Sequence, residues 1–181
     1  NTHKEFHVGH VRNICLGSAL VNLFRHCGYP VIAANYIGDE GTHIAKCLWH
    51  IKRAGAKAPA MKKGEWLGEM YVEATRALEA EAAVSPEAKA KVDGEISAIL
   101  RGIESKNGPD YDLWRETRQW SLDDFNDVYD WFHIKFDRVF FESEVSEESQ
   151  EIVEEYLKSG AFVESEGAIG ADLKEFKLGF M

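Results

Sequence analysis

Apolar residues recur every three or four positions along residues 7–26, which is the spacing of one face of a helix. The repeat is carried by a set of mostly large side chains: Leu16, Leu20, Leu23, Phe24 and Cys27. Neighbouring apolar positions widen this face, so the pattern predicts a helix buried against a sheet, ended by Gly28. The apolar run 30–37 predicts a short strand, followed by a tight turn at 38–41 and a second helix at 42–53.

The pattern changes in the middle of the chain, where Ala, Glu and Lys dominate. Pro86 and the Asn-Gly-Pro cluster at 107–109 break this stretch into three predicted helices, at 64–83, 86–105 and 110–133. The last of them carries a stripe of aromatic side chains at helical spacing. Such a stripe is typical of core packing rather than of a cofactor or metal site.

The last part of the chain returns to strand-like patterns. Residues 136–145 predict a strand, and Ser146 is positioned to cap an acidic helix that runs to about Lys158. Segments 161–163 and 173–181 predict the two strands of a hairpin. The loop that joins these strands is expected around two glycines, Gly167 and Gly170.

The order helix, strand, helix with short connections is typical of a doubly wound α/β unit. We therefore expect an α/β fold in three parts. Residues 1–63 would form the first half of a Rossmann-like domain with a partial parallel sheet, 64–133 a helical insertion, and 134–181 a return to the sheet. The chain opens without an initiator Met and stops in an apolar run, so both ends are expected to be cut.

Composition narrows the classes of function. The formal net charge is −10, which argues against a protein whose main task is to grip a phosphate backbone. Two of the three cysteines fall within apolar helical patterns and none forms a CxxC pair, which favours a reducing, cytoplasmic setting. No apolar run approaches the roughly 20 residues that span a bilayer.

The segment His7-Val8-Gly9-His10, at the start of the first predicted helix, carries the clearest candidate chemistry. A helix amino terminus offers unpaired N–H groups and a positive dipole end, which suit phosphates. Histidines three residues apart lie on one face, so His7 and His10 can both reach a triphosphate. Gly9 would leave room for an adenosine.

Two other interpretations of these histidines remain open. His7 and His10 can be solvated side chains on a capping turn. Alternatively, the close spacing of His3, His7 and His10 suggests a metal site, although no cysteine or carboxylate trio completes it. On this basis no metal ligand is assigned.

The string Asn1-x-x-Lys4-Glu5-x-His7-Val8-Gly9-His10-x-Arg12 resembles the class I motif of the arginyl-tRNA synthetase family. A second string of that family is similar to residues 35–41, Asn-Tyr-Ile-Gly-Asp-Glu-Gly, one strand later. The segment 136–143 also resembles the family, so the similarity spans most of the chain. It is weakest in the helical insertion. The chain departs from the family at His3, where a small residue is common, and at Glu40, where Trp is common.

The resemblance implies a role for each matching residue. His7, Gly9 and His10 would bind ATP, and Lys4 would assist at the phosphates where a later KMSKS loop is degenerate. Asn1 and His7 would border the bound arginine.

The second motif leaves its roles open. Gly38, Asp39 and Gly41 can form the turn, with Asp39 capping the next helix, or they can line the pocket. His43 and Thr42 are further pocket candidates.

The resemblance further implies an arginine–tRNA ligase that uses ATP with Mg²⁺, activates arginine to arginyl-adenylate and transfers it to tRNA(Arg). The tRNA would usually be needed even for the first step. The carboxylates that recognise the guanidinium, the KMSKS-like loop and the anticodon-binding domain would lie outside this chain, which is consistent with its acidic charge. The alternatives are another HxGH nucleotidyltransferase or class I synthetase, and a non-catalytic binding module on the same scaffold.

Overall fold

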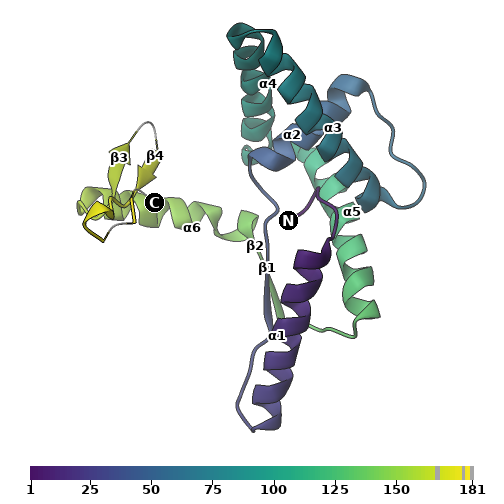
Figure 1. Cartoon of the computed structure of the whole chain (residues 1–181), viewed down its shortest axis with the longest axis vertical. Helices are drawn as coiled ribbons and strands as arrows, with labels where there is room; N and C mark the ends of the chain where they lie inside the picture. Colours follow the sequence, from purple (N-terminus) through teal and green to yellow (C-terminus); the bar gives the residue numbers. More distant parts are fainter. Residues whose placement is uncertain (166–167, 177, 180–181) are drawn as a thin grey trace. The chain divides into compact units, whose positions relative to one another are not determined.

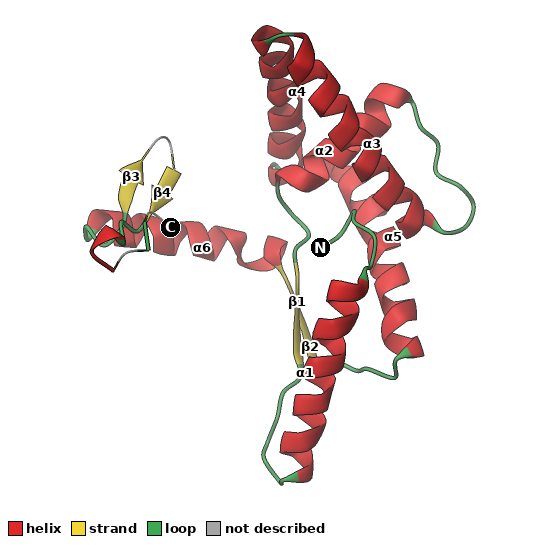
Figure 2. Ribbon diagram, in the orientation of Figure 1, coloured by secondary structure: helices red, strands yellow, loops and turns green. Residues whose placement is uncertain are grey.

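The computed structural model describes residues 1–165, 168–176 and 178–179. It divides into two compact units, Asn1–Phe140 and Phe141–Met181. Most of the chain is helical, and the strands are short (Figures 1 and 2). Among the described residues, no helix is long and apolar enough to cross a membrane.

Up to Phe141 the chain contains the elements that the sequence predicted for residues 7–141, in the predicted order. They are α1 (Val8–His26), β1 (Ala34–Ile37), α2 (Thr42–Ala54), α3 (Lys63–Val84), α4 (Pro86–Glu104), α5 (Pro109–Trp131) and β2 (Arg138–Phe141). The helix boundaries fall within two residues of those predicted, which confirms the helical periods. Both strands are shorter than predicted.

One carboxylate determines where the two strands begin. Asp137 accepts hydrogen bonds from the Ala33 backbone N–H at 2.7 Å and from Arg25 Nη2 at 2.5 Å. The Asp137 N–H in turn donates to the Ala33 carbonyl at 2.8 Å. Strands β1 and β2 start directly after this contact and pair with each other, so they run in the same direction and form a small parallel sheet.

The prediction that the first helix is buried was wrong. No residue of α1 is buried, and Leu16, Leu20 and Leu23 are 60%, 47% and 57% exposed. The paired strands have four residues each and span about 13 Å, whereas the 19-residue helix is about 28 Å long. A sheet of this size cannot cover so broad an apolar face.

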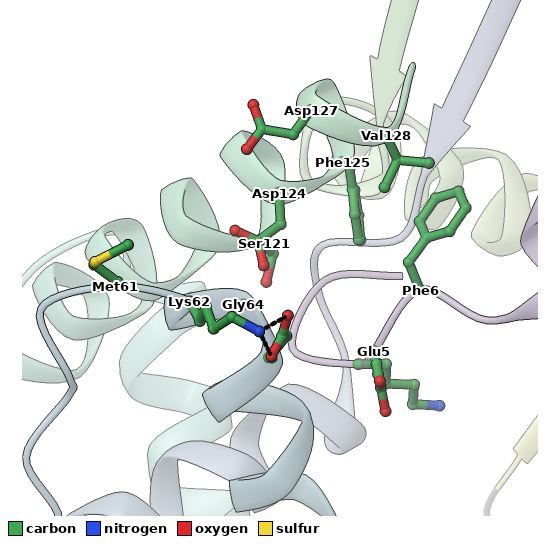
Figure 3. A pocket seen from close by; sticks show the side chains of 12 residues that line it. Glu5, Phe6, Met61, Lys62, Gly64, Ser121, Asp124, Phe125, Asp127 and Val128 are labelled. Atoms are coloured by element: carbon green, nitrogen blue, oxygen red, sulfur yellow. Dashed lines mark hydrogen bonds and ion pairs between the residues drawn. The ribbon is translucent and has the colours of Figure 1, made fainter. Parts of the chain in front are cut away.

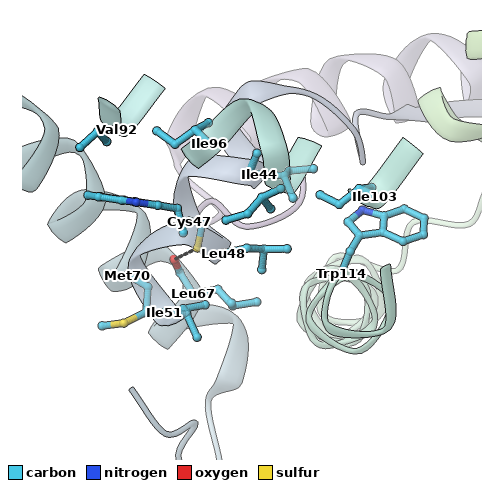
Figure 4. Close-up of a cluster of buried hydrophobic side chains, with 13 residues drawn as sticks. Ile44, Cys47, Leu48, Ile51, Leu67, Met70, Val92, Ile96, Ile103 and Trp114 are labelled. Carbon is cyan, nitrogen blue, oxygen red and sulfur yellow. Dashed lines mark hydrogen bonds between the residues drawn. The ribbon is translucent and has the colours of Figure 1, made fainter. Parts of the chain in front are cut away.

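The hydrophobic core lies among α2, α3, α4 and α5. Figure 4 shows it. Ile44, Leu48 and Leu67 are fully buried at its centre, and Cys47 donates from Sγ to the Leu67 carbonyl at 3.6 Å. Burial raises the pKa of the Cys47 thiol to about 12, so this cysteine behaves as a small hydrophobe. Cys15 and Cys27 are instead exposed.

This core joins α2, which was predicted to belong to the first domain, to the helices of the predicted insertion. The three-part division at 63/64 and 133/134 therefore stays a prediction. The aromatic stripe of α5 packs as predicted, with Trp114 and Phe125 6% and 5% exposed.

The second unit contains α6 (Glu142–Lys158), β3 (Val163–Ser165), β4 (Ala168–Gly170) and the short 3-10 helix η1 (Lys174–Phe176). Helix α6 begins four residues before Ser146, so the predicted cap and the strand at 142–145 were wrong. Glu142 and Glu144 occupy the first turn of α6. Carboxylates there are favoured by the positive end of the helix dipole, which explains the early start.

The predicted hairpin exists with different strands. β3 pairs antiparallel with β4, with Val163 opposite Gly170, so Gly170 lies in a strand rather than in the loop. Residues 174–176 form η1 instead of the predicted strand. The Asp172 side chain accepts a hydrogen bond from the Lys174 N–H at 3.1 Å, and such local bonds favour turns over strands. Gly167 and positions 177, 180 and 181 lie outside the described residues.

Candidate functional site

The two histidines of the HxGH segment form a reciprocal cap on α1. His7 is the N-cap residue, and its Nδ1 accepts from the Gly9 backbone N–H at 3.1 Å. The His7 N–H donates to Nδ1 of His10 at 3.2 Å. Imidazoles thus replace the hydroxyl and carboxylate of an ordinary capping box.

These caps determine where the ring protons lie. An Nδ1 that accepts a hydrogen bond carries no proton, so a neutral ring then carries its proton on Nε2. His7 and His10 both present Nε2–H, a donor, away from the cap. The capping interpretation and the phosphate-binding interpretation are therefore compatible, because the cap uses one nitrogen of each ring and leaves the other.

The two rings stack with centroids 3.9 Å apart and planes at 29°. Partial burial, followed by the neighbouring His7, lowers the pKa of His10 from its ordinary value of 6.5, which favours the neutral ring at pH 7. Gly9 makes the fold-back of His7 feasible, because a Cβ on Gly9 would lie 2.9 Å from Cε1 of His7. The close approach of a ring is thus one physical reason for glycine at this position.

Lys4 lies on the segment that leads into α1. Its ammonium sits over the ring of Tyr71 on α3, 5.0 Å from the centroid. The positive charge of Lys4 contributes to the lowered pKa values of both His10 and His43. The site therefore concentrates positive charge and N–H donors, which suits an anionic ligand.

A cavity of about 160 Å³ brings Asn1 and His10 together with residues of β1 and α5. Its lining is Asn1, Phe6, His10, Asn13, Ile14, Asn35, Tyr36, Ile37, Phe125 and Tyr129. Asn35, from the second motif, donates from Nδ2 to the Tyr129 hydroxyl at 3.1 Å. This cavity is smaller than the roughly 300–1,000 Å³ of typical ligand pockets, so it can enclose part of a ligand such as ATP.

The second motif forms a buried turn. Asp39 is fully buried and accepts from Arg118 Nε at 2.5 Å, while its carbonyl accepts from Trp114 Nε1 at 2.7 Å. The N-cap of α2 is Gly41, with φ of 107°, rather than Asp39. Gly38 accepts a hydrogen bond from the Thr2 backbone N–H at 2.9 Å. These contacts fit the turn-forming role.

His43 lies in the first turn of α2. Burial and then Lys4 lower its pKa to about 4. Its Nε2 is buried and has no hydrogen-bond partner among the described residues. The charge of Lys4 acts on His43 as well as on His10, so His43 stays a pocket candidate.

A larger cavity of about 480 Å³ lies between the Lys4–Phe6 segment, the start of α3 and one face of α5 (Figure 3). Asp124 reaches toward the start of α3, where a Cβ on Gly64 would lie 2.1 Å from its Oδ2. Burial and then Asp127 raise the pKa of Asp124. This cavity carries carboxylates and does not include the two HxGH histidines.

The candidate metal trio is not brought together. His3 is fully buried, and both of its ring nitrogens are engaged, Nδ1 with Thr2 at 3.1 Å and Nε2 with Thr117 at 2.7 Å. Nothing in the sequence pattern singled out Thr117, the partner of His3 on α5, or Arg118, the partner of Asp39. Their importance follows from spatial contacts across more than 75 residues of sequence.

The chain matches known proteins along almost its whole length. A family model described as the catalytic domain of class I (R) tRNA synthetases matches residues 1–180. The arginine–tRNA ligase of Bdellovibrio bacteriovorus is 45% identical over 181 residues, which are 99% of this chain and 31% of that protein. The enzyme of the same name from Porphyromonas gingivalis is 34% identical, over 96% of this chain and 31% of that protein.

A solved structure shares the fold. The crystal structure of arginyl-tRNA synthetase from Plasmodium falciparum has a TM-score of 0.71, with 20% identity, covering 100% of this chain and 29% of that chain. The chain therefore spans about a third of the length of the curated relatives it matches.

Proposed function

The chain belongs to the family of class I (R) tRNA synthetase catalytic domains, and we propose that it forms part of an arginine–tRNA ligase. The match of the family model to residues 1–180 carries this proposal. It favours the arginine enzyme over another HxGH nucleotidyltransferase and over a non-catalytic module. We propose a cytoplasmic location for the whole protein. The small parallel sheet with its flanking helices would be part of a Rossmann-like, doubly wound fold.

The proposed reaction has two steps. An oxygen of the arginine carboxylate attacks the α-phosphorus of ATP, the bond to the bridging oxygen breaks, and pyrophosphate leaves with the electron pair. A terminal hydroxyl of tRNA(Arg) then attacks the carbonyl carbon of arginyl-adenylate and AMP leaves. Mg²⁺ that accompanies ATP would offset the charge of the phosphates.

In the first step negative charge grows on the phosphate oxygens, and positioned donors stabilise it. We assign this task to the Nε2–H groups of His7 and His10, because the α1 cap holds both rings in the donor tautomer. Lys4 adds a positive charge. Gly9 lets the histidine rings and the adenosine approach the backbone.

Asn1 would contact the arginine, with His7 at the border between the two substrates. This assignment is supported by the cavity that Asn1 shares with His10. For Gly38, Asp39 and Gly41 we propose a structural role in the turn, since Asp39 is buried against Arg118. His43 would line the phosphate side of the pocket, close to Lys4.

The test uses the complete protein that carries this chain. AMP formation is measured with ATP, tRNA and each of the twenty amino acids in turn. We expect activity with arginine alone. Activity with a different amino acid would keep the class I assignment and overturn the arginine assignment, and silence with all twenty would refute an aminoacyl-tRNA ligase.

A variant tests the role of the second histidine. His10→Ala should lower the rate of AMP formation by about 10²–10³-fold, the range for loss of one donor to a transition state. Asn22→Ala, at an exposed position of α1 outside both motifs, provides a comparison for general effects on the helix. An unchanged rate in His10→Ala would remove this residue from the proposed mechanism.

A further inference from the structure

His3 departs from the family pattern, and its backbone is unusual. Its φ is +60°, in the left-handed region that residues other than glycine seldom adopt, although His, like Asn and Asp, is found there more often than most. Its side chain is fully buried. The residue directly precedes Lys4, so the conformation at His3 sets the direction in which the chain enters the candidate site.

Two hydrogen bonds attach His3 to helix α5. Its backbone N–H donates to Ser121 Oγ at 2.9 Å, and its ring Nε2 lies 2.7 Å from Thr117 Oγ1. Thr117 and Ser121 are four residues apart, so they lie on one face of α5. Both are buried, at 0% and 2% exposure.

The proton positions in this contact follow from the neighbouring groups. Thr117 Oγ1 lies 2.7 Å from the Leu113 carbonyl, which can only accept, so the hydroxyl proton points there. Thr117 Oγ1 must then accept from His3 Nε2–H. The other nitrogen, Nδ1, is left to accept from the Thr2 hydroxyl at 3.1 Å.

The ring of His3 is therefore neutral, and every polar atom on it is paired. Burial, with His43 of α2 as the second cause, lowers the pKa of His3 to about 3. The same segment is held on its other side, because the Thr2 N–H donates to the Gly38 carbonyl at 2.9 Å. The chain ahead of Lys4 is thus fixed between the second motif and α5.

We propose that His3 is a positioning residue that holds the segment before Lys4 on helix α5 and thereby places the Lys4 ammonium for phosphate binding. This inference rests on the proposed function for the role of Lys4. In this proposal helix α5 supplies the fixed surface on which the segment before Lys4 packs.

The first test measures hydrogen–deuterium exchange in peptides that cover residues 1–10 of the complete protein. His3→Gly removes the ring but tolerates the positive φ, and Thr117→Val removes the acceptor at nearly constant volume. Exchange in these peptides should rise about tenfold in both variants and stay close to that of the wild type in Thr117→Ser. Unchanged exchange in His3→Gly and Thr117→Val would overturn the proposal, whatever the activity.

The second test asks whether His3 acts through Lys4. We expect His3→Gly to lower kcat of AMP formation about tenfold, with KM for arginine unchanged. In the background Lys4→Met the same substitution should cost nothing further, because the residue that it positions is already lost. Equal losses in both backgrounds would mean a general structural role and overturn the proposal.

A matched control separates positioning from stability. Ile96→Ala removes a buried side chain from the core at α4, so it should lower thermal stability and leave kcat at 25 °C and exchange in residues 1–10 unchanged. If the wild type forms no AMP with any amino acid, the proposed function fails. The exchange measurement then still decides whether His3 holds the segment.

Discussion

The buried ion pair between Asp39 and Arg118 offers a sharp test of how the second motif is held. Arg118→Met removes the guanidinium and keeps most of the side-chain length, which takes this cation away from the buried Asp39 carboxylate. Asp39 is fully buried, and the Arg118 side chain is 20% exposed. Solvent therefore cannot replace the lost partner without opening the structure.

The expected cost can be worked out in two ways. An N–O distance of 2.5 Å places the charge centres about 4 Å apart, where the attraction is about 4 kcal/mol at an effective dielectric constant of 20. Breaking a buried pair by removing one partner typically costs about 3–5 kcal/mol. The two values agree, and 3 kcal/mol corresponds to roughly a 100-fold change in an opening equilibrium.

Hydrogen–deuterium exchange of the complete protein measures this opening locally. Peptides from 34–41 and 109–131 should exchange roughly 100-fold faster in Arg118→Met than in the wild type. Arg115→Met is the matched control, because Arg115 is an exposed arginine on the same helix, 5.9 Å from the ring of Tyr111. If the two variants exchange alike in these peptides, the ion pair does not hold the turn and the reasoning is refuted.

Three further predictions concern other positions. Gly68→Ala would put a Cβ 3.2 Å from the Glu5 backbone nitrogen, so it should displace the segment around Lys4 and lower the rate of AMP formation. In the matched variant Gly94→Ala the new Cβ meets nothing within 4 Å, so this substitution should raise the free energy of unfolding by about 0.5–1 kcal/mol. The folded pKa of His43 is about 4, below its ordinary value of 6.5, so its contribution to stability is complete above pH 6.5 and is lost as pH falls toward 4. Thermal melts should show that the melting temperature falls less between pH 6.5 and 4 in His43→Asn than in the wild type. Cys47 should not react with iodoacetamide at pH 8 until the protein is denatured, because its thiol is buried with a pKa of about 12. Mass spectrometry of the peptide that contains Cys47 measures this labelling.

The helices were predictable from the sequence because their information is local. A period of 3.6 residues over 13 to 23 positions identifies α2 to α5, and Pro86 marks the start of one of them. The strand boundaries were not predictable. They depend on Asp137, whose bonds to Ala33 and Arg25 join segments more than 100 residues apart.

In the candidate site, too, the local features were predictable from the sequence and the long-range contacts were not. The HxGH segment was found because His7 and His10 lie within one helical turn, where spacing alone brings them together. The contacts of Asp39 with Arg118 and of His3 with Thr117 were not found, because their partners on α5 are ordinary helix residues separated by 79 and 114 positions. A sequence records no distance between such residues. The exposure of α1 could not be foreseen either, since it depends on the width of the sheet rather than on the helix.

The contact between His3 and Ser121 spans 118 residues, and this separation has a consequence during synthesis on the ribosome. At about 5–20 residues per second, His3 is made roughly 6–24 s before Ser121. Helices α2 to α4 are synthesised within that interval and can begin to pack through contacts close in sequence. The segment around His3, which is made before helices α1 to α5, is therefore among the last of these parts to reach its final position.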